Sequence, residues 1–131
     1  MTRYLLDTDV LVDFSKSIEP VTSQLLAWID GTDTVAVCAI SVAEFAAGLT
    51  PEQAAQAQDF LAALTYWDIS RQAALRAGQE RYSFARAGVT ITTTDALVGA
   101  AAREYGATLV TSNLKDFPTE DLTLLSIRRH G

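Results

Sequence analysis

The chain has 131 residues, a length typical of one domain, and we predict a single domain over 1–131. Hydrophobic residues make up 49% and charged residues 20%, a composition that excludes an intrinsically disordered chain. The net charge of −6 counts against a protein that binds nucleic acid through bulk positive charge, because Lys and Arg normally contact the phosphates. It does not exclude an acidic site whose charge is offset by bound cations.

The predicted elements alternate between short apolar runs and longer helical stretches. In chain order they are strand 4–6, helix 10–16, helix 20–31, strand 34–40, helix 41–49, helix 51–64, strand 66–69, helix 70–87, helix 94–105, strand 108–111 and strand 122–127. Expected N-caps include Asp9 for the first helix and Ser41, with Glu44 in the capping-box position, for the third. Thr93 or Thr94 is expected to cap the last helix.

Strands that alternate with helices predict an α/β sandwich with a mostly parallel central sheet. In such folds ligand sites lie beyond the carboxyl ends of the strands. The residues that directly follow each apolar strand are therefore the ones in which we look for chemistry.

The cysteine content and the hydropathy bear on the compartment. The single cysteine, Cys38, excludes an internal disulfide and lies in an apolar run that predicts a buried position. The first apolar stretch is short and is interrupted by Asp7, unlike a signal peptide. No run reaches the ~20 apolar residues of a membrane span. We therefore expect a cytoplasmic protein that has no membrane partner.

Four carboxylates and one amide occupy the strand-end positions. They are Asp7 after the first strand, Glu44 in the helix after the second, Asp95 in the first turn of helix 94–105, and Asn113 and Asp116 after strand 108–111. Each also has an ordinary structural interpretation, as a helix cap, a partner of a helix dipole or a solvated surface acid. Asp7 and Glu44, however, stand between apolar neighbours, where an unpaired carboxylate is costly to bury.

Converging carboxylates repel each other and raise their own pKa values, and a bound divalent cation removes that penalty. An all-oxygen set of ligands suits Mg²⁺ or Mn²⁺ rather than zinc. The single histidine, His130, lies in the tail, so neither a His/Cys zinc set nor a Ser–His–Asp triad can be built. Acid–base chemistry would then depend on carboxylates or on metal-bound water.

Four segments that contain these acids resemble the motifs of PIN-domain proteins. LLDTDVLVD at 5–13 resembles the opening motif, and SVAEFAAG at 41–48 resembles the second. TDALVGAAA at 94–102 resembles the third, and LVTSNLKDF at 109–117 resembles the last in a form close to that of VapC toxins. Their order and spacing fit the family over essentially the whole chain.

The resemblance implies a PIN-like α/β/α sandwich with an acidic pocket that holds Mg²⁺ or Mn²⁺. Asp7, Glu44 and Asp95 would be the core metal-binding set, and Asp116 would be the fourth acid. Asn113 lies where some relatives place a polar or acidic ligand, so the division of labour between Asn113 and Asp116 stays open.

Neighbours of these acids are secondary candidates. Asp9 lies where the family often has Asn, and it either contacts the metal shell or caps the helix; we favour the cap. Thr111 and Ser112 could hydrogen-bond the carboxylates or a phosphate. Lys115 is the preferred RNA contact because it neighbours the predicted pocket, ahead of Arg71, Arg81, Arg86 and the tail residues Arg128 and Arg129.

The implied activity is that of a metal-dependent endoribonuclease, the toxin of a type II toxin–antitoxin pair. Carboxylates would hold one or two cations, and water of lowered pKa would attack a phosphodiester of RNA, with tRNA or rRNA as the expected substrates. Relatives form homodimers and are neutralised by a VapB-type antitoxin. Some apolar residues of the early helices would either line a groove for that antitoxin or belong to the core: Leu11, Phe14, Leu25 and Trp28.

Two other interpretations are weighed against this one. Residues 7–11 also resemble the start of haloacid-dehalogenase-like phosphotransferases, but the lysine and paired acids that this family needs are crowded before the last strand. Glu44 and Asp95 would also stay unexplained. The second alternative is a catalytically silent binding module with the PIN fold. Against it, none of the core acids is missing, and a metal titration would discriminate.

Overall fold

A computed structural model describes residues 1–127, and within them five strands form one parallel sheet in the order β3-β2-β1-β4-β5. The strands are β1 (Arg3–Leu6), β2 (Thr34–Cys38), β3 (Thr65–Trp67), β4 (Thr108–Val110) and β5 (Leu124–Leu125). Every neighbouring pair is parallel, which confirms the predicted sheet. Arg128, Arg129 and His130, named from the sequence, lie outside the described residues.

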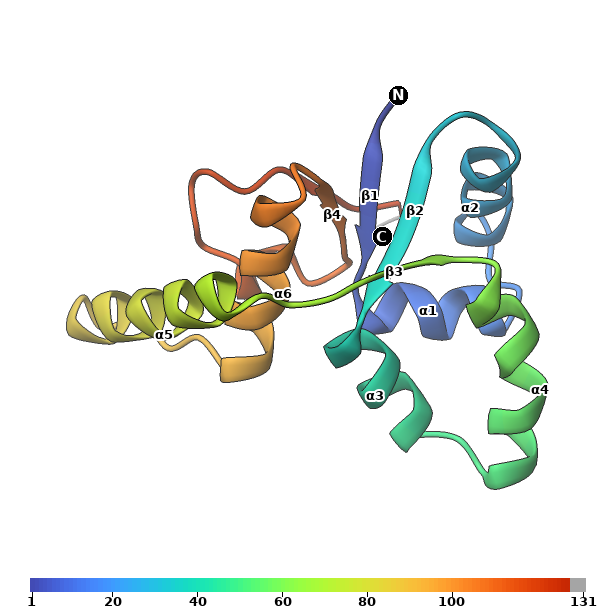
Figure 1. Cartoon of the computed structure of the whole chain (residues 1–131), viewed down its shortest axis with the longest axis horizontal. Helices are drawn as coiled ribbons and strands as arrows, with labels where there is room; N and C mark the ends of the chain where they lie inside the picture. Colours follow the sequence, from blue (N-terminus) through green and yellow to red (C-terminus); the bar gives the residue numbers. More distant parts are fainter. Residues whose placement is uncertain (128–131) are drawn as a thin grey trace.

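Helices cover both faces of the sheet, as Figure 1 shows. They are α1 (Thr8–Ser15), α2 (Val21–Asp30), α3 (Ala39–Ala47), α4 (Pro51–Ala62), α5 (Arg71–Arg86) and α6 (Thr93–Glu104). On one face lie α1, α2, α3 and α4, and on the other lies α6, with α5 packed on its outer side. This arrangement confirms the predicted α/β/α sandwich.

Side chains that alternate along each central strand build the two cores. Leu5 of β1 and Leu109 of β4 pack with α6, whereas the next residues, Leu6 and Val110, pack with α1 and α2. Strands covered on both faces need apolar residues on both faces, which is why they appear as uninterrupted apolar runs. The first polar residue after such a run marks the place where the strand leaves the core.

The second strand is shorter than predicted, and the following helix begins earlier. We expected a strand over 34–40 with Ser41 as the helix cap, but β2 ends at Cys38, which is itself the N-cap of α3. Ser41 lies inside α3, fully buried, with its hydroxyl 3.8 Å from the Cys38 sulfur. The predicted capping-box role of Glu44 is therefore wrong as well. The last strand is also shorter than the predicted 122–127, at Leu124–Leu125.

The strand order places a switch point between β1 and β4. From β1 the chain builds outward to β2 and β3, and it then returns to the other side of β1 to add β4 and β5. In open parallel sheets the crevice at such a point, beyond the carboxyl ends of the strands, is the usual ligand site. The helices α1, α3 and α6 all begin at this end of the sheet (Figure 1). Within residues 1–127, no helix is both long and apolar enough to cross a membrane.

Candidate active site

Asp7 lies at the switch point and is fixed from several sides. Its backbone N–H donates to the Val110 carbonyl (3.0 Å), which continues the β1–β4 pairing by one residue. One carboxylate oxygen accepts a hydrogen bond from the Thr8 N–H (2.9 Å), so Asp7 is the N-cap of α1. The other accepts the Thr111 hydroxyl (2.9 Å). With 7% of its surface exposed, Asp7 is a buried acid.

Burial raises the pKa of Asp7 from 3.8 to about 6. The hydrogen bonds from Thr8 and Thr111 lower it again in part, while the negative charges of Asp9 and Asp95 add to the rise. The charged form of Asp7 is thus held in a poorly solvated place beside other acids. A carboxylate in this position gains more from a nearby cation than a solvated one does.

Asp95 lies in the first turn of α6, directly after its cap. The cap is Thr92, not the predicted Thr93 or Thr94, and its hydroxyl oxygen accepts a hydrogen bond from the Asp95 N–H (3.1 Å). Burial raises the pKa of Asp95, and the charges of Asp116 and Glu44 raise it further, whereas the Thr92 side chain lowers it. Asp95 also raises the pKa of Asp7, so its charge interacts with acids from three other parts of the chain: Asp7, Glu44 and Asp116.

Glu44 reaches the site from α3. Its carboxylate accepts a hydrogen bond from the Thr8 hydroxyl (2.8 Å), a side chain in the first turn of α1. The sequence reasoning missed Thr8 as a site residue, although its place between Asp7 and Asp9 could have pointed to it. Glu44 itself is exposed, so this contact holds an otherwise solvated acid beside the start of α1.

Asp9 does not cap α1, which corrects the role that we favoured for it. Its Oδ2 accepts a hydrogen bond from the backbone N–H of Ser112 (2.8 Å), so it ties α1 to the residues after β4. Its Oδ1 is buried and makes no hydrogen bond with any of the residues 1–127. A buried oxygen without a donor is costly, and a cation or a water molecule would satisfy it.

The segment after β4 supplies the remaining candidates. Thr111 is almost fully buried, and besides donating to Asp7 its hydroxyl accepts the Asn113 N–H (3.0 Å). The 3-10 helix η1 (Leu114–Asp116) follows. Asn113, Lys115 and Asp116 are exposed there, and of these the Asp116 charge acts on Asp95.

The donor chemistry suits a hard divalent cation, but the site is not a closed cage. Among residues 1–127, no group of three or more His, Cys, Asp or Glu side chains is arranged so that it could hold a metal ion. A bound cation would nevertheless reduce the repulsion among these carboxylates. It would also give a partner to Oδ1 of Asp9, which has none among residues 1–127. Glu44 and Asp116 are exposed side chains, and the charges of both act on Asp95.

Other residues named from the sequence have structural roles. Leu11 and Leu25 are fully buried core residues. Phe14 and Trp28 are partly buried; Phe14 packs edge-on against Phe60, and Trp28 stacks on Tyr4. Two of the three α5 arginines considered as RNA contacts bond to the chain itself: Arg81 donates to the Ile91 carbonyl (2.7 Å) and Arg86 to the Tyr82 hydroxyl (3.2 Å).

Comparisons with known proteins identify the family and the fold. The PIN-domain family model matches residues 4–118. No curated protein sequence matches the chain.

Among solved structures, the chain is similar to a chain of the VapBC2 complex of Rickettsia felis bound to a promoter DNA fragment. The two share 27% identity and superpose with a TM-score of 0.83, and the match covers 95% of this chain and 98% of that chain. It is also similar to the DNA-bound VapBC of Salmonella typhimurium, with 24% identity, a TM-score of 0.83, and 98% and 100% covered.

A sarcin–ricin-loop-cleaving VapC toxin of Mycobacterium tuberculosis shares the fold at 13% identity and a TM-score of 0.56, with 81% and 86% covered. The expected resemblance to VapC toxins is thus confirmed. Because the PIN model spans most of its length, the chain belongs to the PIN-domain family.

Proposed function

We propose that this chain is the toxin of a VapBC-type toxin–antitoxin pair and acts as an endoribonuclease that depends on Mg²⁺ or Mn²⁺. One observation supports this most: a buried carboxylate, Asp7, stands at the β1–β4 switch point with its pKa raised to about 6, beside Asp9 and Asp95. Among residues 1–127 Asp7 has no basic partner, and an acid kept in that setting is typical of a cation site rather than of a structural ion pair.

Asp7 and Asp95 would hold the cation, with Glu44 and Asp116 completing its ligands. When bound, the cation would supply charge neutralisation for a scissile phosphate and a water molecule of lowered pKa. Thr111 and Thr8 orient the carboxylates of Asp7 and Glu44 through their hydroxyls. The choice between Asn113 and Asp116 favours Asp116, because its charge acts on Asp95.

Lys115 would contact the RNA backbone. It is exposed and directly precedes Asp116, so its charge lies beside the proposed reaction centre of a protein with a net charge of −6. The remaining partners follow from the family: a VapB-type antitoxin, a second copy of the chain, and tRNA or rRNA as substrate, which would place the activity in the cytoplasm.

The test is cleavage by the purified chain, free of any partner, of total tRNA and rRNA with Mg²⁺, Mn²⁺ or EDTA. Asp7→Asn removes a proposed ligand and controls for contaminating nuclease. Asp33→Asn is the matched control, because Asp33 precedes β2 at the opposite end of the sheet and contacts the Thr2 N–H.

Discrete fragments that need the metal, are lost in Asp7→Asn and are kept in Asp33→Asn would support the proposal. Equal cleavage by Asp7→Asn would mean a contaminating nuclease if repurified protein loses it from both chains alike, and would otherwise overturn the proposed site. If the wild-type chain binds Mn²⁺ but cleaves neither RNA class, the metal site stands and tRNA and rRNA are excluded as substrates under these conditions. If it binds no metal, the chain is a silent module with the PIN fold.

A further inference from the structure

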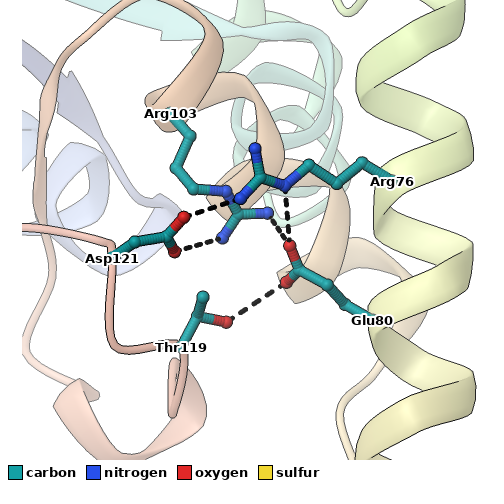
Figure 2. A network of polar contacts seen from close by, with 5 residues as sticks. All are labelled: Arg76, Glu80, Arg103, Thr119 and Asp121. Carbon is teal, nitrogen blue, oxygen red and sulfur yellow. Dashed lines mark hydrogen bonds and ion pairs between the residues drawn. The ribbon is translucent and has the colours of Figure 1, made fainter.

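Five residues outside the proposed metal-binding set form a network of ion pairs and hydrogen bonds (Figure 2). Arg103 of α6 stands between Glu80 of α5 and Asp121, which precedes β5. Arg76 contacts Glu80 (3.2 Å) and Asp121 (2.6 Å), and the Thr119 hydroxyl donates to Glu80 (3.2 Å). The network therefore joins two helices to one segment, residues 117–121.

Arg103 is the centre of this network. Only 6% of its side chain is exposed, against 51% for Arg76. It pairs with Glu80 through Nη2, whereas its Nη1, 3.6 Å from Asp121 Oδ1, makes an ion pair but no hydrogen bond within residues 1–127. A guanidinium buried this far has to be matched by carboxylates, and a planar fork can hold two of them at fixed positions.

This segment, together with the residue that follows it, packs on α6 through apolar side chains. Phe117 and Leu122, which flank the network residues Thr119 and Asp121, are both buried in the core on the α6 side. A Cβ on Gly99 of α6 would come within 3.4 Å of Leu122 and 3.8 Å of Phe117. The absence of a side chain at Gly99 thus lets the segment lie directly against the helix that carries Asp95.

Asp116 stands at the start of this anchored segment. Its carboxylate accepts no hydrogen bond from the described part of the chain, and it lies in a 3-10 helix of three residues. A small cavity of about 10 Å³ is lined by Glu80 together with Asp95 and Asp116. The ion network and the proposed site are therefore neighbours that share Glu80 at this cavity. Asp116 is held by the bond from its N–H to the Asn113 carbonyl (3.0 Å) and by the anchored residues that follow it.

We propose that Arg103 is a positioning residue: together with Glu80 it anchors residues 117–121 on α5 and α6 and so holds Asp116 opposite Asp95. This inference rests on the proposed function, because it assigns Arg103 to the support of that metal site. Arg103 touches neither the metal nor the RNA in this account. It acts mainly through Glu80, which accepts the Thr119 hydroxyl, while Arg76 makes the shorter of the two contacts to Asp121.

The decisive variants remove the contacts that residues 117–121 make with the two helices, through Thr119 and Asp121. Thr119→Val combined with Asp121→Asn releases the segment and leaves the Arg103–Glu80 pair between the helices intact. Arg103→Met removes the centre of the network and can fail to fold, so it is secondary. Asp121→Glu keeps the carboxylate and is the conservative variant. Asp33→Asn is the matched control, because Asp33 is a partly buried acid outside the network with one long-range contact.

The first measurement is amide hydrogen exchange of the metal-free proteins. The reporters are the N–H groups of Asp116 and Phe117, which donate to Asn113 (3.0 Å) and Leu114 (3.2 Å). In the double variant we expect these amides to exchange at least about fivefold faster, while those of α5 and α6 keep their rates. Unchanged exchange at Asp116 and Phe117 would overturn the inference.

The second measurement is the affinity for Mn²⁺ by titration calorimetry. We expect about a tenfold rise in Kd for the double variant, the size of effect that outer-shell changes produce at metal sites. Asp121→Glu and Asp33→Asn should stay within about twofold of wild type. Equal binding by the wild-type chain and the double variant would overturn the inference alone. No Mn²⁺ binding by the wild-type chain would overturn the proposed function and the inference with it.

Discussion

The Thr111 hydroxyl, at the end of β4, donates a hydrogen bond of 2.9 Å to Asp7, at the end of β1. The two residues are 104 positions apart in sequence, and the β1–β4 register brings them together, since Leu6 pairs with Val110 immediately before them. The bond connects the first and the last of the four motifs. It is also one of the two contacts that keep the pKa of the buried Asp7 from rising further.

Removing this hydroxyl should destabilise the chain. Thr111→Val keeps the shape of the side chain but leaves Asp7 Oδ2 and the Asn113 N–H without their partner. A hydrogen bond to a charged group contributes about 2 kcal/mol, and we expect a loss of that size at pH 7.5 by urea denaturation. Thr111→Ser keeps the hydroxyl and should lose less than half as much. Equal stability of Thr111→Val and wild type would contradict the buried bond.

Asp7→Asn should stabilise the metal-free chain at neutral pH. Because the folded chain holds the Asp7 proton up to about pH 6 and the unfolded chain only to about 3.8, wild-type stability falls as pH rises through that window. The full cost above pH 6 corresponds to up to ~3 kcal/mol. Asn removes the charge and can still cap α1.

The stabilisation by Asp7→Asn should therefore be close to zero at pH 4 and rise to its full value by pH 7. Urea denaturation at a series of pH values, with Asp33→Asn as the control, measures it directly. A variant that is less stable than wild type at pH 7.5 would show that the charge of Asp7 is not a burden to the folded chain.

Binding of Mn²⁺ should weaken below pH 6. A cation must displace the Asp7 proton, so with a pKa of about 6 the affinity at pH 5 should be about tenfold lower than at pH 7.5. At pH 6 the binding should release about half a proton from Asp7, which calorimetry in two buffers of different ionisation enthalpy can count. Affinity that is equal at pH 5 and pH 7.5 would exclude Asp7 as a ligand.

The sheet and the approximate positions of the acids could be predicted from sequence because one topology rule links them. Apolar runs on a doubly covered parallel sheet identify the strands, and the strands' carboxyl ends all point to one edge. Asp7 and Asp116, far apart in sequence, could be assigned to the same edge on that basis. The distance between their carboxylates could not be predicted from the sequence, because it depends on side-chain orientation.

Local ambiguities account for the wrong predictions. Asp7 and Asp9 are both good helix caps, and the register of β1 on β4 decides between them by leaving the Ser112 N–H for Asp9. Ile40 is β-branched and extended the predicted strand, but α3 starts at Ala39. Arg103 had no sequence signal at all, since its partners come from α5 and from the segment before β5.

Replacing Lys115 tests whether this acidic chain binds the RNA backbone beside the proposed site. The chain has two lysines, Lys115 beside the proposed site and Lys16 after α1, so Lys16→Gln is a matched control for Lys115→Gln. If Lys115 neutralises one phosphate of single-stranded RNA, its loss should lower the slope of log K against log salt by about 0.7. KM should rise while kcat changes little, because a phosphate contact positions the substrate before and during the reaction alike. The opposite result would be a wild-type salt slope for Lys115→Gln and a lowered slope for Lys16→Gln. It would show that the RNA backbone contacts the end of α1 and not the segment after β4.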